Sequence, residues 1–334
     1  MMQGARTVDV RRPGALCRRR AAGSGALVAR ASSVEAAPEK AKKAKFSDAN
    51  FPMADGRTYH LGVRAGEMAA RILSVGDTGR ASRLAKFLAP PEGESEVFTY
   101  ASDRNFTTFT GTFEGVPVSI IATGMGAPMM DFVVRESRAV VDGPMAFVRV
   151  GTCGMVDGEM PLGTVTVAQS SVLVRRDPDR FGEETGEGAG ELPYIISKPV
   201  PADPALAGAF AEELRAAAAE MPEAGANVAE GFNATACSFY SSQGRIDAAF
   251  DDRNAPLIDE LVASVPGLLT LEMETFHLLD LARCSRGSIS AAAAAIGLAQ
   301  RRTNEFLEPE KILALEQLAG RSALRALART PLGE

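Results

Sequence analysis

From residue 58 onward, short apolar runs of strand length alternate with longer segments of helical character, and glycine or proline often marks the change. Short apolar runs bounded by turn residues indicate buried strands, while a capping residue or proline marks the start of a helix. Strands are predicted at 70–75, 116–122, 146–150, 164–173, 268–273 and 290–299, and helices at 76–88, 203–220, 275–283 and from Pro128 and Pro309 onward. This alternation predicts one α/β domain, 58–330, with a mixed central sheet flanked by helices.

Composition disfavours several other classes of protein. The chain has 334 residues, 46% of them hydrophobic, which suffices for one large core or two modest ones. Its apolar run 290–299 falls well short of the roughly 20 residues of a membrane span. No Gly-x-Gly-x-x-Gly motif follows the first strand with an acid downstream, which disfavours a dinucleotide-binding enzyme. Neither a disulfide framework nor a histidine metal site is expected, because the candidate residues are few and lack paired spacing: Cys17, Cys153, Cys237, Cys284, His60 and His277.

Charge is distributed unevenly along the chain. Residues 1–34 carry seven arginines and one acid, so they contribute +6 to a net charge of −6 and leave −12 on the other 300 residues. An acidic folded part disfavours a nucleic-acid-binding face. The arginine-rich head is typical of a transit peptide, which predicts import into the chloroplast of an alga or plant, with 35–57 as a linker. A mitochondrial protein, or a cytoplasmic one that keeps a basic tail, is the alternative.

Three arginines and their neighbours are candidates for binding an anion. Gly76 and Arg80 lie where a predicted strand gives way to a helix, and a helix N-terminus exposes N–H groups that bind anions. The same turn is also a common packing solution. Arg149 lies inside an apolar strand, three residues before Thr152, where an unpaired charge is costly. An internal ion pair explains Arg149 equally well, and Arg104 by itself indicates only surface charge.

Six segments occur in the order and spacing of one family. They are Tyr59-His-Leu-Gly62, Val75-Gly-Asp-Thr-Gly-Arg80, Arg104-Asn-Phe-Thr-Thr108, Ala122-Thr-Gly-Met-Gly-Ala-Pro128, Arg149-Val-Gly-Thr-Cys-Gly154 and Leu271-Glu-Met-Glu-Thr275. Together they resemble the nucleoside phosphorylase-I family over residues 58–328, nearly all of the predicted fold. The resemblance implies an enzyme that cleaves a nucleoside with inorganic phosphate as co-substrate and has no other cofactor.

The resemblance also implies a site shared between subunits. Phosphate in this family is bound by the positions that match Gly76, Arg80, Arg149 and Thr152. An arginine at the position of Arg104 joins them from the neighbouring subunit, and the position of His60 reaches across the same interface to the ribose 5′-hydroxyl. A homo-oligomer, either a dimer or a hexamer of dimers, is therefore implied. A turn residue that packs on Tyr59 is the alternative for His60.

For the ribose, the resemblance assigns Glu274 to the 2′- and 3′-hydroxyls and Met273 to the face of the sugar. One carboxylate can accept hydrogen bonds from two vicinal hydroxyls, which suits this role. Without the resemblance, Glu274 is also explained as a carboxylate that stabilises the N-terminus of the next helix.

For the base, Ser238-Phe-Tyr-Ser-Ser-Gln-Gly-Arg245 resembles the uracil-recognition loop of uridine phosphorylases, with Phe239 stacking and Gln243 and Arg245 contacting the base. An amide complements the N3–H and O2 edge of uracil, and a guanidinium near O4 stabilises the departing anion. A polar turn and a surface arginine are the alternatives. Arg302 is expected to assist Arg245. The resemblance therefore implies uridine phosphorolysis, with Arg149, Arg245 and Glu274 as catalytic residues.

Departures from the family bear on metal binding and on substrate. Bacterial uridine phosphorylases hold a potassium ion with a glutamate and a serine where this chain has Asn105 and Met129. A thioether is a poor potassium ligand, so no metal site is expected. Purine-specific relatives carry an aspartate after the last strand, whereas 297–303 contains no acid. A broader or purine nucleoside phosphorylase remains one alternative, and a non-catalytic storage or binding protein is another. Three arginines argue against a nucleosidase, because water needs no cationic site.

Overall fold

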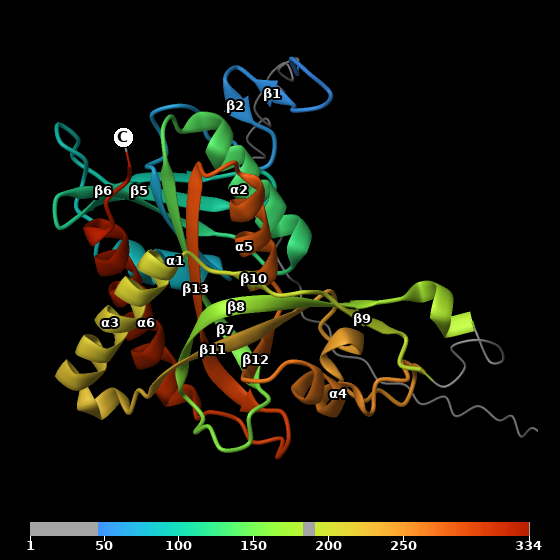
Figure 1. The fold of residues 1–334 in the computed structure, drawn as a ribbon. Helices are drawn as coiled ribbons and strands as arrows, with labels where there is room; N and C mark the ends of the chain where they lie inside the picture. The colour runs from blue at the N-terminus through green and yellow to red at the C-terminus, as the bar shows by residue number, and fades with distance from the viewer. Residues whose placement is uncertain (1–45, 183–190, 334) are drawn as a thin grey trace, which may run out of the picture. The chain divides into compact units, whose positions relative to one another are not determined.

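The computed structural model describes residues 46–182 and 191–333 (Figure 1). The predicted transit peptide, 1–34, and the linker up to residue 45 lie outside the described residues. The helices are α1 (Thr78–Ala85), α2 (Ala127–Val140), α3 (Pro204–Glu220), α4 (Leu257–Ser264), α5 (Thr275–Cys284) and α6 (Pro309–Arg329). The strands are β1 (Met53–Ala54), β2 (Arg57–Thr58), β3 (Arg71–Val75), β4 (Phe98–Ala101), β5 (Thr107–Phe113), β6 (Val116–Ala122), β7 (Met145–Met155), β8 (Val165–Arg176), β9 (Tyr194–Ile196), β10 (Val200–Pro201), β11 (Val228–Ala236), β12 (Leu268–Glu272) and β13 (Ile289–Gln300).

Within the described residues, one 11-stranded sheet organises the fold. Its order is β10-β8-β11-β12-β7-β3-β6-β5-β4, with β13 paired to both β7 and β8, and β9 paired to β8. The central pairs β3–β6, β3–β7 and β7–β13 are parallel, whereas β5–β6, β7–β12 and β8–β13 are antiparallel. The predicted α/β fold with a mixed central sheet and flanking helices is therefore confirmed (Figure 1).

Capping residues set the helix boundaries where the sequence predicted them. The Asp203 carboxylate accepts hydrogen bonds of 3.0 Å from the backbone N–H groups of Ala205 and Leu206, and α3 follows directly. Pro128 and Pro309 lie in the first turns of α2 and α6, where the missing proline N–H leaves no helical bond unmade. These local signals explain why the predicted starts of three helices agree with the structure.

The helices pack in two groups on the sheet. α3 and α6 pack on each other, and α2 packs on α5 (Figure 1). The main core lies between these helices and the central strands. Its largest fully buried side chains include Ile72, Leu73, Phe147 and Phe210. Such burial is the main favourable term that holds the sheet and its helices together.

Several described elements were not predicted from the sequence, among them α4, β4, β9 and β10, and two further differences are informative. Residues 46–57, expected in a linker, contain β1, which pairs antiparallel with β2. Strand β11 was not predicted, because the segment Val228-Ala-Glu-Gly-Phe-Asn-Ala-Thr-Ala236 contains polar and small residues. It is nevertheless the parallel neighbour of both β8 and β12. Its buried Asn233 is accommodated because its amide hydrogen-bonds Ser171 at 2.7 Å and Thr270 at 3.2 Å.

A change of partner along β7 opens the sheet at one place. β3 pairs with β7 only as far as Val150, and β12 pairs with β7 only from Gly154 onward. Residues 151–153 therefore have no strand on that side, while β13 continues to pair along the other side. Ligands of open α/β sheets bind beyond the carboxyl ends of strands at such interruptions.

None of the helices within 46–182 and 191–333 has both the length and the apolarity of a bilayer-spanning segment. Over the same residues, no group of three or more His, Cys, Asp or Glu side chains has the arrangement of a metal site.

Candidate active site

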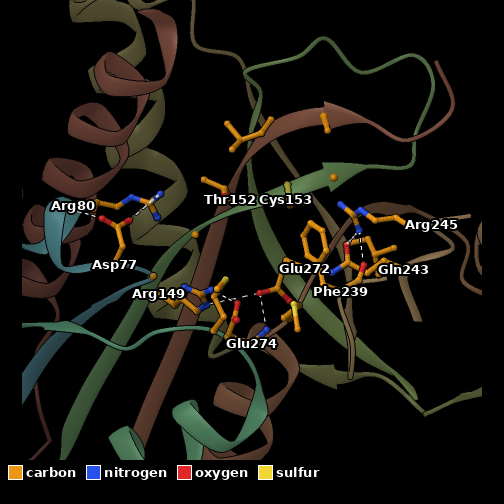
Figure 2. A pocket seen from close by; sticks show the side chains of 18 of the residues that line it. Asp77, Arg80, Arg149, Thr152, Cys153, Phe239, Gln243, Arg245, Glu272 and Glu274 are labelled. Atoms are coloured by element: carbon orange, nitrogen blue, oxygen red, sulfur yellow. Dashed lines mark hydrogen bonds and ion pairs between the residues drawn. The ribbon is translucent and has the colours of Figure 1, made fainter. Parts of the chain in front are cut away.

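A cavity of about 330 Å³ lies at the interruption between β3, β7 and β12 (Figure 2). Its volume falls at the lower end of the range of small-molecule sites, about 300–1,000 Å³. Nine of the twelve predicted site residues line it: Gly76, Arg80, Arg149, Thr152, Phe239, Gln243, Arg245, Met273 and Glu274. The other three, His60, Arg104 and Arg302, lie outside its lining. The structure therefore gathers residues that are up to 198 positions apart in the sequence.

Arg149 lies in the middle of β7 and is almost fully buried. Its Nη2 donates to Glu274, and its Nε lies 3.8 Å from a carboxylate oxygen of Glu272. The buried Nε and Nη1 atoms have no hydrogen-bond partner among the described residues. Burial by itself would lower the pKa of Arg149, but the two carboxylates outweigh it and raise that pKa. The guanidinium therefore stays charged, and its Nε and Nη1 donors remain available to a ligand.

Glycine makes room for this guanidinium. A Cβ placed on Gly151 would lie 3.2 Å from three guanidinium atoms of Arg149, closer than ordinary van der Waals contact. The next residue, Thr152, lines the cavity, and its hydroxyl makes no hydrogen bond to the described residues. Unsatisfied buried donors cost about 1–3 kcal/mol each. Unpaired N–H groups and a free hydroxyl in one cavity therefore favour an anionic ligand with several acceptor oxygens.

Arg80 lies on α1 and faces the same cavity from the other side (Figure 2). It has its own counter-ion: Nη2 lies 2.7 Å and Nε 2.9 Å from Oε1 of the buried Glu316 on α6. Asp77 is the N-cap of α1, because its carboxylate accepts the backbone N–H of Arg80 at 2.8 Å. Gly76 lies between this cap and the end of β3. Its carbonyl accepts the N–H of Gly124, which fixes the turn.

Glu274 occupies the N-cap position of α5, yet its side chain makes no capping hydrogen bond. Glu272 caps this helix instead, since its Oε2 accepts the backbone N–H groups of Glu274 at 2.9 Å and Thr275 at 3.0 Å. The Glu274 carboxylate instead accepts from Arg149 and from the backbone N–H of Gly126 at 2.5 Å. The Glu274 carboxylate therefore does not cap α5 by a hydrogen bond, and it lines the cavity.

Glu272 is a site residue that the sequence analysis missed. It lines the cavity and also accepts a 2.6 Å hydrogen bond from Thr235 Oγ1 on β11. Burial, followed by the charge of Glu274, raises the pKa of Glu272. Nearby, the buried Cys153 also lines the cavity. Burial and the charge of Glu272 raise the pKa of its thiol, which disfavours the nucleophilic thiolate.

The opposite end of the cavity is formed by the loop after β11 (Figure 2). Arg245 Nη1 donates to the Gln243 amide oxygen at 2.5 Å and to the Phe239 carbonyl at 2.8 Å. Its guanidinium carbon lies 3.7 Å from the centroid of the Phe239 ring and covers one face of that ring. Asn254 holds the loop backbone by donating to the carbonyls of Ser241 and Arg245, both at 3.0 Å. This end therefore presents an oriented amide, a guanidinium and an aromatic ring.

A second arginine, Arg301, stands beside this group. Its stem crosses Gly154, where a Cβ would lie 2.7 Å from Arg301 Cδ. Its Nη1 is buried without a hydrogen-bond partner among the described residues. Burial and then the charge of Arg301 lower the pKa of Arg245 to about 10. The two guanidinium groups repel each other, and neither forms an ion pair with a described carboxylate. A developing negative charge at this end of the cavity would be stabilised.

Comparisons with known proteins agree with this geometry. Residues 70–330 match the family described as the phosphorylase superfamily. A uridine phosphorylase structure from Phytophthora capsici is 47% identical, with a TM-score of 0.80 over 86% of this chain and 100% of that one. The chain is 28% identical to a uridine phosphorylase of Thermococcus kodakarensis over 78% of this chain and 84% of that protein. A purine nucleoside phosphorylase of Oceanobacillus iheyensis is 36% identical, but only over 34% of this chain and 46% of that protein.

This chain belongs to the phosphorylase superfamily. The match covers every strand of the central sheet and all six helices described above. The expectation of a nucleoside phosphorylase-type fold, drawn from six short motifs, is thereby confirmed.

In this phosphorylase, Arg302 does not lie where the sequence suggested, at the base end beside Arg245. Arg302 is exposed and turns away from the cavity, with Nε donating to the Val156 carbonyl and Nη1 to Asp259, both at 3.0 Å. The structure therefore does not bring Arg302 to the base end. Arg301 lies close enough to Arg245 to influence its pKa, although it is not among the residues that line the cavity. The two consecutive arginines have different neighbours, Gly154 for Arg301 and the Val156 carbonyl for Arg302, which the sequence alone did not resolve.

His60 and Arg104 lie together on another part of the phosphorylase. Arg104 donates to the Tyr59 hydroxyl, and its guanidinium carbon lies 4.3 Å from the centroid of the Tyr59 ring. The His60 ring stacks on Phe132 with a centroid distance of 3.7 Å. Neither side chain lines the cavity of its own subunit. A role in the site would therefore require a second subunit.

Proposed function

We propose that this phosphorylase cleaves uridine with inorganic phosphate and releases uracil and ribose 1-phosphate. A phosphate oxygen forms a bond to C1′ while the bond from C1′ to N1 breaks. The electron pair of that bond leaves with the uracil, whose negative charge spreads toward O2 and O4. The protein must therefore hold an anion, grip the sugar and stabilise a second anion as it forms.

One observation carries the proposal: Arg149 keeps two buried donors unpaired in a cavity that is also lined by Thr152, whose hydroxyl has no partner among the described residues. Phosphate has acceptor oxygens for all three groups. Its binding to Nε and Nη1 leaves the Nη2 contact with Glu274 intact. The Arg149 guanidinium then positions both the attacking phosphate and the Glu274 carboxylate, which accepts hydrogen bonds from the ribose 2′- and 3′-hydroxyls. Met273, on the same cavity wall, supports the sugar.

The base end supports uracil as the leaving group. Gln243 has an amide oriented by Arg245, and an amide can pair with the N3–H and O2 edge of uracil. Arg245 and Arg301 provide positive charge on the side where O4 would lie, and the free face of Phe239 suits stacking. Similarity to uridine phosphorylases over most of the chain, at 47% identity for one of them, favours this substrate over purine nucleosides. The sequence match to the purine nucleoside phosphorylase of Oceanobacillus iheyensis covers only 34% of the chain.

Arg104 and His60 are proposed to complete the site of a neighbouring subunit in a homo-oligomer, with Arg104 near phosphate and His60 at the ribose 5′-hydroxyl. Their distance from the cavity of their own subunit supports this arrangement. A fully active monomer, measured by sedimentation at the assay concentration, would exclude it.

The direct test is uracil release from uridine with and without phosphate. We expect release only with phosphate, and formation of ribose 1-phosphate in equal amount. Release without phosphate would indicate a nucleosidase, equal rates with inosine a broader phosphorylase, and no release with any nucleoside a binding or storage protein.

Residues 1–34 are proposed to direct import into a chloroplast, on the basis of their seven arginines and single acid. A fluorescent protein fused after residue 45 should enter plastids. Uptake by mitochondria, or retention in the cytosol, would contradict this location without affecting the proposed reaction.

A further inference from the structure

Glu136, on α2, is a buried carboxylate that nothing in the proposed reaction uses. Only 6% of this residue is exposed, and no Lys or Arg among the described residues pairs with it. Its oxygens accept the backbone N–H of His60 at 3.0 Å, the backbone N–H of Leu61 at 2.8 Å and the Nδ1 of His60 at 2.6 Å. A buried charge held only by hydrogen bonds is costly, so its retention calls for a reason.

The same helix holds the imidazole from a second direction. Phe132 precedes Glu136 by one turn of α2, and its ring stacks on His60 with an interplanar angle of 11°. The Tyr59 ring packs edge-on against His60 at 4.9 Å. Stacking on Phe132 thus fixes the plane of the His60 ring, and the hydrogen bond to Glu136 fixes the direction of Nδ1 within that plane.

The hydrogen bond also decides which ring nitrogen carries the proton. An ionised carboxylate is only an acceptor, so the short contact requires a hydrogen on Nδ1. In the neutral ring, Nε2 is then an acceptor. Nε2 makes no hydrogen bond within the described residues, and it is not sealed from solvent as the Nε2 of His277 is.

We propose that Glu136 is a positioning residue for substrate binding: it locks His60 in the Nδ1–H form and presents Nε2 as an acceptor to the ribose 5′-hydroxyl in the neighbouring subunit. This inference rests on the proposed function and on the shared site. The benefit would appear only with substrates that have a 5′-hydroxyl, because Glu136 acts on the nucleoside only through His60.

The structure offers a matched control. Glu67 lies in the same N-terminal segment and is also mostly buried. It pairs with Arg57 at 2.8 Å and Arg64 at 2.9 Å but does not contact His60. Glu67→Gln therefore loosens this segment without changing the histidine. A merely structural role for Glu136 would make Glu136→Gln resemble Glu67→Gln.

The experiment compares kcat/KM for uridine and 5′-deoxyuridine in the wild type, Glu136→Gln and Glu67→Gln, with the oligomeric state and melting temperature of each. In the wild type we expect uridine to be favoured about tenfold, the size of one hydrogen bond. The preference should fall to near one in Glu136→Gln, whose amide can donate to Nδ1 and so favour the other tautomer, and should persist in Glu67→Gln. A persistent preference in Glu136→Gln overturns the inference and leaves uridine phosphorolysis standing. A wild type inactive on both substrates overturns the proposed function first.

A second measurement needs no variant at position 136. The chain has only two histidines, so ¹⁵N-histidine spectra of the intact protein contain two rings, and His60→Asn identifies one of them. We expect a protonated Nδ1 and an unprotonated Nε2 for His60 at neutral pH. A proton on Nε2 alone would overturn the inference even if Glu136→Gln failed to fold.

Discussion

The two ends of the cavity are built from different kinds of structure. The end around Arg149 consists of strands and of a helix start, and its charged side chains are almost fully buried. The end around Arg245 is a loop with a 3₁₀ turn, Ser241–Gln243, where Phe239 is 47% exposed. Phe306, which also lines the cavity, is 74% exposed. The ion pair of the first end is therefore buried already without a ligand, whereas aromatic surface beside the second end remains exposed.

Their electrostatics differ in the same way. At the strand end each cation has a carboxylate: Arg80 has Glu316, and Arg149 has Glu274. At the loop end Arg245 and Arg301 face each other without a carboxylate in the described residues. Phosphate brings its charge into the site before the reaction, whereas the charge of uracil develops only in the transition state. Unbalanced cations at the base end therefore stabilise the transition state more than the bound substrate.

The largest effect should come from breaking the strand end. Arg149→Ala leaves Glu274 and Glu272 without their cation and phosphate without its anchor. We expect a loss of about a hundredfold or more in kcat/KM, corresponding to roughly 3 kcal/mol. Steady-state assays of uracil release at several phosphate concentrations measure it. Arg135→Ala, on the exposed face of α2, should keep full activity. Wild-type turnover in Arg149→Ala would mean that Arg149 is only an internal ion pair.

The same contrast explains what the sequence could reveal. Strands such as β6 and helices such as α3 were predictable because apolar runs and caps are local signals. β11 was missed because its polar residues are satisfied by β8 and β12, which are distant in the sequence. The pairing of β1 with β2 was missed because strands of two residues carry almost no pattern.

Within the site, residues with a motif were found and those defined by geometry were not. Arg149 was conspicuous as a charge in an apolar strand. Glu272 was overlooked because only the structure separates the carboxylate that caps α5 from the one that faces the cavity. Arg301 and Arg302 are adjacent, and the path of one stem across Gly154 distinguishes them. Such choices depend on packing between segments, which a local pattern does not encode.

A smaller effect should follow from neutralising the base end. Arg245→Ala removes a charge that matters mainly as the base departs. We expect kcat for uridine to fall about 10- to 100-fold, with a smaller loss for 5-nitrouridine, whose base anion needs less help. Rates for both nucleosides at saturating phosphate give the comparison. Arg301→Ala should show the same trend, whereas Arg302→Ala, which loses only an exposed pair with Asp259, should not. Equal losses in Arg301→Ala and Arg302→Ala would contradict the assignment of Arg301 to the base end.

Specificity should depend on Gln243 to a lesser degree. Cytosine has an acceptor at N3 and an amine at the 4-position. Its amine and the Arg245 guanidinium would both be hydrogen-bond donors facing each other, and both would be left without an acceptor. The wild type should therefore reject cytidine and inosine, and Gln243→Ala should lower kcat/KM for uridine about tenfold. A panel of uridine, cytidine, inosine and thymidine measures this. If cytidine or inosine matched uridine in the wild type, the uracil assignment would fail.

The smallest effect concerns pH and the second carboxylate beside Arg149. Burial and the charge of Glu274 raise the pKa of Glu272, so Glu272 takes up a proton at a higher pH than an exposed glutamate. Protonation removes a negative charge near the anion site, and phosphate should then bind more tightly.

In Glu272→Gln that charge is absent at every pH, while the amide oxygen can still accept from the N–H groups that start α5. The ratio of phosphate Kd in the wild type to that in Glu272→Gln should be near one on the acidic side. It should rise to about three- to fivefold as the pH passes the raised pKa of Glu272. Because both proteins meet the same phosphate species, the ionisation of phosphate cancels in the ratio. Calorimetric titration across the pH range, with melting temperatures to show that the helix cap survives, gives the answer. A ratio that stays near one at every pH would mean that Glu272 contributes no charge to the anion site. A constant ratio above one would mean that Glu272 stays ionised throughout, and either result contradicts the expected rise.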